Sequence, residues 1–311
     1  MDKPEETPVG ADPTIDDAAR AVNFYQITPS APPAPRPARK RKPWWVRIPL
    51  MALGTALAAL LMLMFIENSL IYYPFKSAAR GGWDPPTPTG ENVAFVSADG
   101  TQLTGWYMPH PQPQAVVLFA CGNGGNMTYW RDYFQDLQEQ CRVTVMGFDY
   151  RGYGRSHGSP NEQGVLADAR AARKWLAAKA GIAEDHIVLL GRSIGGGVMV
   201  DLAGDGARAL VVESTFTSLP DVAARVYPFL PVRYVMRTRF DSLSKIKNYR
   251  SPLFVSHGTG DRLIPFAMGQ QLYDTAGSTQ KKFYTVEGGD HNDPQPPGYY
   301  TTLAEFFAQL P

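Results

Sequence analysis

A serine between glycines, in Gly191-Arg192-Ser193-Ile194-Gly195, is the group in this sequence best suited to nucleophilic chemistry. A short apolar run typical of a strand precedes it, and the residues after it favour a helix. A strand-to-helix turn of this kind exposes a serine hydroxyl, and the small glycines allow the backbone to pack closely around it. We therefore predict that Ser193 is a catalytic nucleophile. The alternative is that it only caps the N-terminus of a glycine-rich helix.

A histidine base and an orienting carboxylate must accompany such a serine. His291 lies in a polar loop after the last predicted strand and before the final helix, where the order serine, acid, histidine along the chain requires it. Asp261 follows the predicted strand at residues 252–256 in a tight loop. We predict His291 as the base and Asp261 as the acid that orients it. The other histidines occupy less suitable positions: His110, His157, His186 and His257.

Two backbone N–H groups near the serine are needed to stabilise negative charge on the substrate oxygen. The amide of Ile194, directly after the nucleophile, is the first candidate. The second is predicted in the glycine-rich loop at residues 121–126, where we select Asn123. This loop lacks the Lys-Ser/Thr pair of a phosphate-binding loop. The predicted chemistry requires no metal and no organic cofactor.

Hydrophobic patterning indicates which elements position these groups. Residues 91–97 and 101–108 alternate apolar and polar side chains around Asp99-Gly100, which predicts a β-hairpin. Short continuous apolar runs follow, separated by helical stretches, at residues 115–120, 143–148, 187–190, 209–212, 252–256 and 282–286. Continuous runs suit parallel strands covered by helices on both faces. We predict an α/β fold with a mostly parallel sheet, whose reactive groups gather at the carboxyl ends of the strands.

Composition narrows the functional classes. A net charge of +1 over 311 residues does not favour a nucleic-acid partner. Cys121 and Cys141 lack the spacing of metal ligands. They are predicted at opposite ends of neighbouring strands, roughly 17–20 Å apart, whereas a disulfide needs Cα atoms within about 7 Å. We therefore predict two free thiols and no metal site.

The N-terminal region predicts a membrane anchor. Residues 1–43 are acidic, then proline-rich, then basic, which is typical of a disordered tail. Residues 48–66 carry no charge, close to the roughly 20 apolar residues that cross a bilayer. With Trp44 and Trp45 as interfacial anchors, we predict a transmembrane signal anchor at residues 44–66. A cleaved signal peptide would have a shorter apolar core and a small-residue cleavage site.

The basic residues before the anchor predict a cytoplasmic N-terminus and an extracytoplasmic C-terminal part, periplasmic if the source is bacterial. Residues 67–90 are predicted to form a Pro/Gly-rich connector, and residues 91–311 the catalytic domain. Residues 216–248 are apolar without strand periodicity and predict a small helical cap over Ser193. An apolar cap beside a membrane suits an acyl or lipid-like substrate. The alternative is ordinary packing within the cap.

Several motifs together resemble one family. Residues 149–156 read Asp-Tyr-Arg-Gly-Tyr-Gly-Arg-Ser, similar to the D-x-R-G-x-G-x-S stretch of α/β hydrolases. With the segments at residues 191–196 and 213–216 and the Asp261 loop, residues 68–311 resemble the single-pass, membrane-anchored branch of these hydrolases. The resemblance implies the α/β-hydrolase fold and a Ser193–Asp261–His291 triad. The branch includes lysophospholipid and protein-depalmitoylating hydrolases. One departure is Cys121-Gly122, where the family usually has His-Gly.

The function predicted from the sequence is that of a membrane-anchored serine hydrolase, which cleaves an acyl ester of a small or lipid-like molecule through an acyl-enzyme. A thioesterase or a peptidase with the same triad is an alternative. A non-catalytic, membrane-tethered binding or scaffold protein is an alternative from another class, and the tail could serve a separate cytoplasmic partner. The oligomeric state is left open. Asp149 and Arg151 are predicted to hold the loop beside the site.

Overall fold

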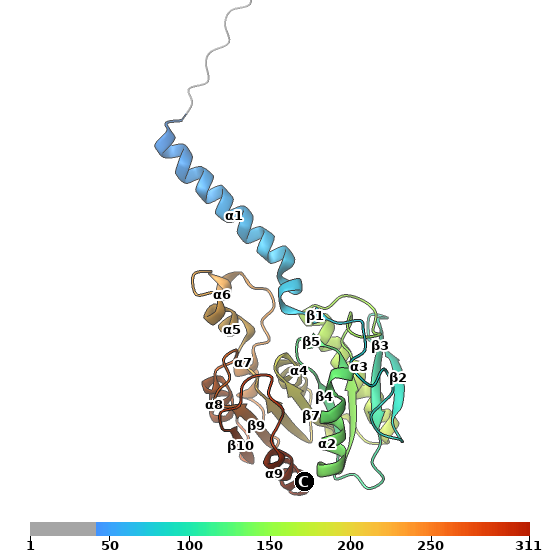
Figure 1. Ribbon diagram of the computed structural model, residues 1–311. Helices are drawn as coiled ribbons and strands as arrows, with labels where there is room; N and C mark the ends of the chain where they lie inside the picture. Colours follow the sequence, from blue (N-terminus) through green and yellow to red (C-terminus); the bar gives the residue numbers. More distant parts are fainter. Residues whose placement is uncertain (1–41) are drawn as a thin grey trace, which may run out of the picture. The chain divides into compact units, whose positions relative to one another are not determined.

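The protein is represented by a computed structural model that describes residues 42–311 (Figure 1). Nearly all of the predicted tail at residues 1–43 therefore lies outside the described residues. The chain divides into two units between Ala52 and Leu53. The second unit, Leu53–Pro311, contains the sheet, its helices and the C-terminal part of the first helix, and it is the unit described below.

Helix α1, Trp44–Ile71, is 28 residues long. At about 1.5 Å per residue it measures about 42 Å, more than the hydrocarbon thickness of a bilayer. Within residues 42–311 it is the one helix that is long and apolar enough to cross a membrane. It continues past residue 66, where the predicted span ends, so the first part of the predicted connector is helical.

The central sheet has eight strands in the order β10-β9-β8-β7-β4-β6-β3-β2. Only the hairpin of β2 and β3 introduces antiparallel pairs, and all other neighbours run parallel. The bounds are Glu91–Val96 for β2, Gln102–Met108 for β3, Ala115–Ala120 for β4, Val143–Phe148 for β6, Val188–Arg192 for β7, Ala209–Glu213 for β8, Leu253–Gly258 for β9 and Lys281–Val286 for β10. The predicted α/β fold, with its hairpin and six further strands, is confirmed.

The strand order also explains which helices cover which face. The chain moves from β4 to β6 in one direction along the sheet and then returns to β7 on the other side of β4. Right-handed crossovers therefore place α2 on one face, and α3 and α4 on the other, as Figure 1 shows. The bounds are Arg131–Cys141 for α2, Glu162–Ala180 for α3, Ile194–Ala203 for α4, Phe266–Thr275 for α8 and Pro297–Ala308 for α9, with short 3-10 helices at Met127–Trp130 and Glu184–His186.

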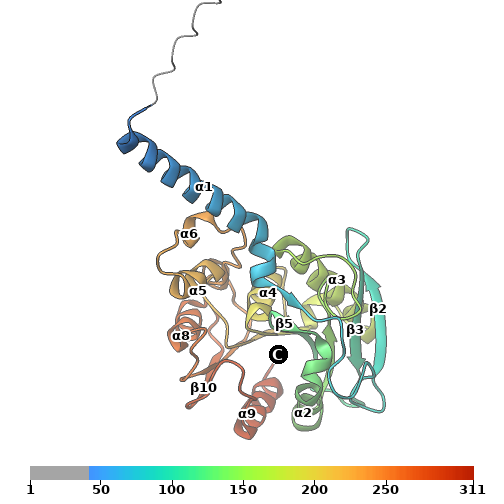
Figure 2. The same ribbon diagram turned by 45° about the horizontal axis from the view of Figure 1, so that its top comes forward.

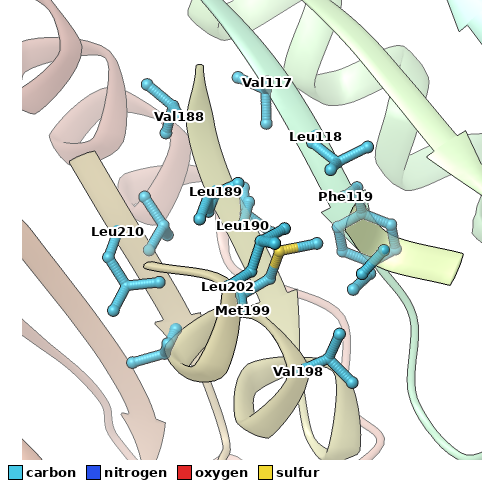
Figure 3. Close-up of a cluster of buried hydrophobic side chains, with 14 of the residues drawn as sticks. Val117, Leu118, Phe119, Val188, Leu189, Leu190, Val198, Met199, Leu202 and Leu210 are labelled. Atoms are coloured by element: carbon cyan, nitrogen blue, oxygen red, sulfur yellow. The ribbon is translucent and has the colours of Figure 1, made fainter. Parts of the chain in front are cut away.

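The reversal of direction beside β4 creates a crevice at the carboxyl ends of β4 and β7, where ligands bind in open α/β sheets. The core beneath it is closely packed (Figure 3). Leu118 of β4, Leu190 of β7 and Met199 of α4 are all completely buried. Each such side chain contributes about 1.5–3 kcal/mol through burial, so the ends of these strands rest on a rigid platform.

The segment between α1 and the sheet packs against the domain along its length. Strand β1, Tyr73–Pro74, pairs in parallel with β5, Gly124–Gly125. Further on, the carbonyl oxygen of Trp83 accepts a hydrogen bond of 2.8 Å from the indole Nε1 of the buried Trp106. The connector predicted at residues 67–90 thus forms part of the compact unit.

The segment between β8 and β9 contains three short helices. These are α5 at Leu219–Val226, α6 at Val232–Val235 and α7 at Ser242–Ile246. The carboxylate of Glu162, at the start of α3, accepts hydrogen bonds from the backbone N–H groups of Arg239 (2.7 Å) and Phe240 (2.8 Å). These bonds fasten the segment to the sheet domain. The three helices lie within residues 216–248, where the sequence predicts a cap.

Both cysteines are free, as predicted, and both are buried. Cys121 follows β4, and Cys141 lies at the end of α2, where its Sγ is 3.4 Å from the carbonyl oxygen of Tyr300. Burial raises the pKa of the Cys121 thiol far above its ordinary value and that of Cys141 to about 12. Both thiols are therefore neutral, unreactive core groups near neutral pH.

Candidate active site

Ser193 occupies a strained turn between β7 and α4. Its φ of 56° and ψ of −121° lie in a region that non-glycine residues rarely adopt. Such a conformation costs about 1–3 kcal/mol and persists only where its surroundings enforce it. Here the N–H of Ser193 donates to the carbonyl oxygen of Glu213 (2.9 Å), and its carbonyl oxygen accepts from the hydroxyl of Thr215 (2.7 Å). Ser193 makes no side-chain capping bond, which argues against a purely structural role as a helix cap.

The two glycines of the turn are required by close backbone contacts. A Cβ atom on Gly195 would lie 2.1 Å from the carbonyl oxygen of Ala120, and one on Gly191 would lie 2.2 Å from that of Gly195. Without these side chains, α4 can begin directly against the end of β4. This brings the loop after β4 next to Ser193, because the Ser193 Cβ would be only 3.7 Å from a Cβ on Gly122.

Three of the predicted site residues form a hydrogen-bonded chain. The Nε2 atom of His291 lies 3.1 Å from the Oγ of Ser193, and its Nδ1 lies 2.8 Å from Oδ2 of Asp261. With Nδ1 protonated toward the carboxylate, Nε2 is free to accept the serine proton. The loops after β7, β9 and β10 thus bring together residues up to 98 positions apart in the sequence.

The carboxylate of Asp261 is held in its ionised form. Its Oδ1 accepts hydrogen bonds from the N–H groups of Leu263 (3.0 Å) and Ile264 (2.7 Å). Burial alone would raise the pKa of Asp261, but hydrogen bonds from His257 and His291 outweigh it and hold that pKa well below its ordinary value. A carboxylate that stays charged can orient the imidazole of His291 and stabilise its protonated form.

His257 orders the acid loop. Its Nε2 lies 2.8 Å from the carbonyl oxygen of Ile264 and 3.4 Å from Oδ2 of Asp261. The neighbouring Arg262 points to a different partner, since its Nε lies 3.3 Å from Oδ2 of Asp290. Asp290 also accepts a bond from the N–H of His291 (2.8 Å), which makes it a turn-forming group.

The predicted oxyanion donors, Asn123 and Ile194, line the same cavity as Ser193. Asn123 is held from three sides. Its carbonyl oxygen accepts from the N–H of Tyr73 (2.9 Å) and the hydroxyl of Tyr153 (2.6 Å), and its side-chain Nδ2 donates to the carbonyl oxygen of Ile71 (3.0 Å). Within residues 42–311, neither the Asn123 nor the Ile194 N–H is bonded to another protein group, so both are free to donate to a ligand.

Arg192 is a supporting residue that the sequence reasoning did not identify. Its side chain is buried, and its Nη2 donates to the carbonyl oxygens of His291 (2.9 Å) and Asp293 (2.6 Å). The guanidinium lies 5.6 Å from the ring centroid of Trp130 and 4.0 Å from a carboxylate oxygen of Glu213. It therefore ties the histidine loop to the serine turn. In the sequence, only the position of Arg192 directly before Ser193 could have indicated this role.

Glu213, at the end of β8, is completely buried and bonded to two phenols. The hydroxyl of Tyr133, from α2, donates to its carboxylate at 2.5 Å, and the hydroxyl of Tyr299, from α9, donates to the same oxygen. Burial raises the pKa of both phenols well above the ordinary value, which keeps them protonated as donors. This network joins three elements behind the serine turn.

Asp149 and Arg151 stabilise the loop that follows β6. Arg151 forms a buried ion pair with Asp168 (Nη2 to Oδ1, 2.7 Å) and reaches Asp99 at the same distance. Oδ1 of Asp149 accepts a bond of 2.7 Å from the N–H of Met127, just after the glycine-rich loop. These contacts are consistent with the structural role expected for both residues.

The candidate site opens into an apolar cavity of about 390 Å³. Its lining includes Ser193 together with cap residues such as Val222, Val226 and Leu230 from α5 and the segment after it. The last three turns of α1 form a second part of the lining. The sequence analysis did not predict this contribution. A cavity of this size and character suits an apolar substrate group.

These features define a class of protein with a parallel α/β sheet and a strained serine at the end of a central strand. Comparisons agree with this class. A family model described as an alpha/beta hydrolase domain matches residues 113–298. The chain is 35% identical over 254 residues to the uncharacterized protein Rv2307c of Mycobacterium tuberculosis, covering 80% of this chain and 89% of that protein. This chain belongs to the α/β-hydrolase family.

Two further similarities extend the comparison. The uncharacterized membrane protein YNL320W of Saccharomyces cerevisiae is 28% identical over 271 residues, covering 84% of this chain and 94% of that protein. The crystal structure of the esterase Pf2001 from Pyrococcus furiosus superimposes with a TM-score of 0.63, covering 77% of this chain and 98% of that one. At 20% identity, that structure supports the fold alone.

Proposed function

We propose that this protein is a membrane-anchored serine hydrolase that cleaves acyl esters. The observation that carries the proposal is the chain of hydrogen bonds from Ser193 through His291 to Asp261, which opens into an apolar cavity. The nucleophile, the base and the acid are within the distances that such chemistry requires. A scaffold protein would have no need for this arrangement or for the strain stored at Ser193.

The reaction follows from the geometry. The Oγ of Ser193 bonds to the acyl carbon while Nε2 of His291 takes the hydroxyl proton. The N–H groups of Ile194 and Asn123 stabilise the oxyanion of the tetrahedral intermediate. His291 then gives its proton to the departing alkoxide, which leaves as an alcohol. Water, deprotonated by the same histidine, attacks the acyl-enzyme, and the carboxylic acid departs as Ser193 regains a proton.

Labelling of the full chain by a fluorophosphonate, together with hydrolysis of p-nitrophenyl esters, tests this function. We expect the wild type to be labelled and active, and Ser193→Ala to lose both properties. Ser244→Ala, at an exposed position in α7, is the matched control and should retain both. A folded wild-type chain that is neither labelled nor active would overturn the proposal and favour the binding or scaffold function.

The anchor and its orientation are part of the proposal. Residues 44–66 of α1 cross the membrane, the tail is cytoplasmic, and the catalytic domain from about residue 67 lies outside. The apolar length of α1 and the basic residues before it support this topology. A C-terminal alkaline phosphatase fusion, which is active only outside the cytoplasm, should be active. A fusion that is expressed but inactive would place the catalytic domain in the cytoplasm and contradict the proposed topology.

A further inference from the structure

One face of the anchor helix forms part of the cavity wall. Leu60, Leu63, Met64, Glu67 and Ile71 recur at helical spacing and all line the cavity that contains Ser193. These residues belong to the same compact unit as the catalytic domain. In Figures 1 and 2, the C-terminal half of α1 runs beside α6.

The remaining face of the same turns points away from the protein. Leu61, Met62 and Phe65 are 49%, 64% and 85% exposed, respectively, and none lines the cavity. The helix therefore has two apolar faces with different surroundings. One face contacts the candidate site, and the other is suited to lipid tails.

Specific polar contacts hold α1 in this position. The buried carboxylate of Glu67 accepts hydrogen bonds from the N–H groups of Thr238 (2.7 Å) and Arg237 (3.1 Å) in the cap. At the last residue of the helix, the carbonyl oxygen of Ile71 accepts from the side chain of Asn123. The wall is thus bonded both to the cap and to the loop with the proposed oxyanion donor.

The cavity wall overlaps the predicted membrane span. The span covers residues 44–66 and the wall covers residues 60–71, so residues 60–66 belong to both. At about 1.5 Å per residue, this overlap corresponds to about 10 Å of depth. In the proposed topology, the cavity therefore borders the acyl region of the outer part of the bilayer.

The cap exposes aromatic side chains of the kind expected near the interface between lipid and water. Phe229 and Tyr234 are 98% and 91% exposed, and Tyr227 is 54% exposed. They lie on or between α5 and α6, the helices that complete the cavity opposite α1. Exposed aromatic side chains are costly in water but favourable at the interface between lipid and water.

We infer that α1 is the wall that selects the acyl chain, and that the substrate is an acyl ester carried by a lipid of the bilayer. The acyl chain of the substrate passes from the bilayer into the cavity between α1 and the α5–α6 region, so that it never has to cross water. This inference rests on the proposed function and adds to it the substrate class and a specificity-determining element. The anchor then acts both as a tether and as part of the binding site.

Substitutions on the two faces of α1 test the wall. The full chain is reconstituted in lipid nanodiscs, and the ratio of kcat/KM for long-chain to short-chain p-nitrophenyl esters is measured. We expect Leu63→Trp, which fills the cavity, to lower this ratio at least tenfold. Leu63→Ala should shift the preferred chain toward greater length. Met62→Trp, on the exposed face, should leave the ratio unchanged.

Fluorophosphonate labelling of each variant shows whether it is folded and has a competent site. Labelled Leu63 variants with the wild-type chain-length ratio would overturn the role of α1. A wild type without labelling or short-ester hydrolysis would instead contradict the proposed function itself, so the two failures are distinguishable. If Leu63→Trp does not fold, the opposite shift expected for Leu63→Ala still decides the question.

The source of the acyl chain requires a separate measurement. Wild-type protein in nanodiscs is given phospholipid, lysophospholipid or an S-palmitoylated membrane peptide, and released fatty acid is quantified. We expect release from at least one of the two lipids, with Ser193→Ala inactive. Release from the peptide alone would overturn the lipid assignment.

Discussion

Arg192 and His291 are joined by a hydrogen bond of 2.9 Å from the guanidinium Nη2 to the backbone carbonyl oxygen. Arg192 precedes the candidate nucleophile, so this bond connects the loop of the base directly to the serine turn. Arg192 is therefore a positioning residue. It fixes the distance between His291 and Ser193 without touching the reacting atoms.

Replacing Arg192 should weaken catalysis more than binding. We expect Arg192→Met to lower kcat roughly 10–100-fold with a much smaller change in KM, because a small displacement of the base is costly. Arg192→Lys should restore only part of the loss, since one ammonium cannot reproduce the planar fork. Steady-state kinetics on a short ester measures both constants. Arg250→Met, at an exposed position, is the control. If it lowered kcat as much as Arg192→Met does, the loss would reflect a general effect on folding and not the position of His291.

Asp261→Asn should preserve the fold but disable the base. The amide can still accept the loop N–H bonds, but it cannot stabilise the imidazolium of His291. We expect kcat to fall roughly 10³–10⁴-fold, the size of effect seen when such an acid is neutralised. Asp290→Asn is the matched control and should have a much smaller effect, because the Asp290 carboxylate bonds to the backbone N–H groups of His291 and Arg262 and to the Arg262 side chain rather than to the imidazole. Similar losses in both variants would argue against the acid role of Asp261.

Asp149 should make stability depend on pH. Burial raises its pKa to about 7, and within residues 42–311 its Oδ2 has no hydrogen-bond partner. Between about pH 4 and 7, the folded protein keeps a proton that the unfolded chain releases, so this residue lowers stability as pH rises through that range. Asp149→Asn keeps the bond from Met127 and removes the titration.

We therefore expect the free energy of unfolding of Asp149→Asn to exceed that of the wild type by a few kcal/mol above pH 7, converging near pH 4. Urea unfolding at a series of pH values measures the difference between the two proteins. A difference that does not change with pH would contradict the raised pKa. The comparison with wild type cancels the contributions of other titrating groups.

Glu67 should hold the cap against α1. Glu67→Ala removes the acceptor for the backbone N–H groups of Arg237 and Thr238, and we expect these amides to exchange hydrogen at least tenfold faster. Hydrogen exchange of the nanodisc-bound protein, read by mass spectrometry, reports on this segment. Glu67→Gln retains one acceptor oxygen and should give an intermediate rate. Unchanged exchange in Glu67→Ala would show that packing alone positions the cap.

The local features of this protein could be read from its sequence because they depend on neighbouring residues. Alternating side chains around Asp99-Gly100 specify the hairpin, and the glycines flanking Ser193 specify the strand-to-helix turn. Continuous apolar runs mark strands buried on both faces. Chain order alone then selects Asp261 and His291, because each follows a strand whose carboxyl end faces the same edge of the sheet.

Other features were decided only by the tertiary structure. Nothing near Arg192 indicates that its side chain reaches a carbonyl oxygen 99 residues away, and nothing near Glu67 indicates bonds to a cap about 170 residues further on. An uncharged run such as residues 48–66 indicates a membrane span whichever of its faces contacts protein. Hydropathy records how apolar a residue is, but only the packed chain determines whether its neighbour is lipid or a binding cavity.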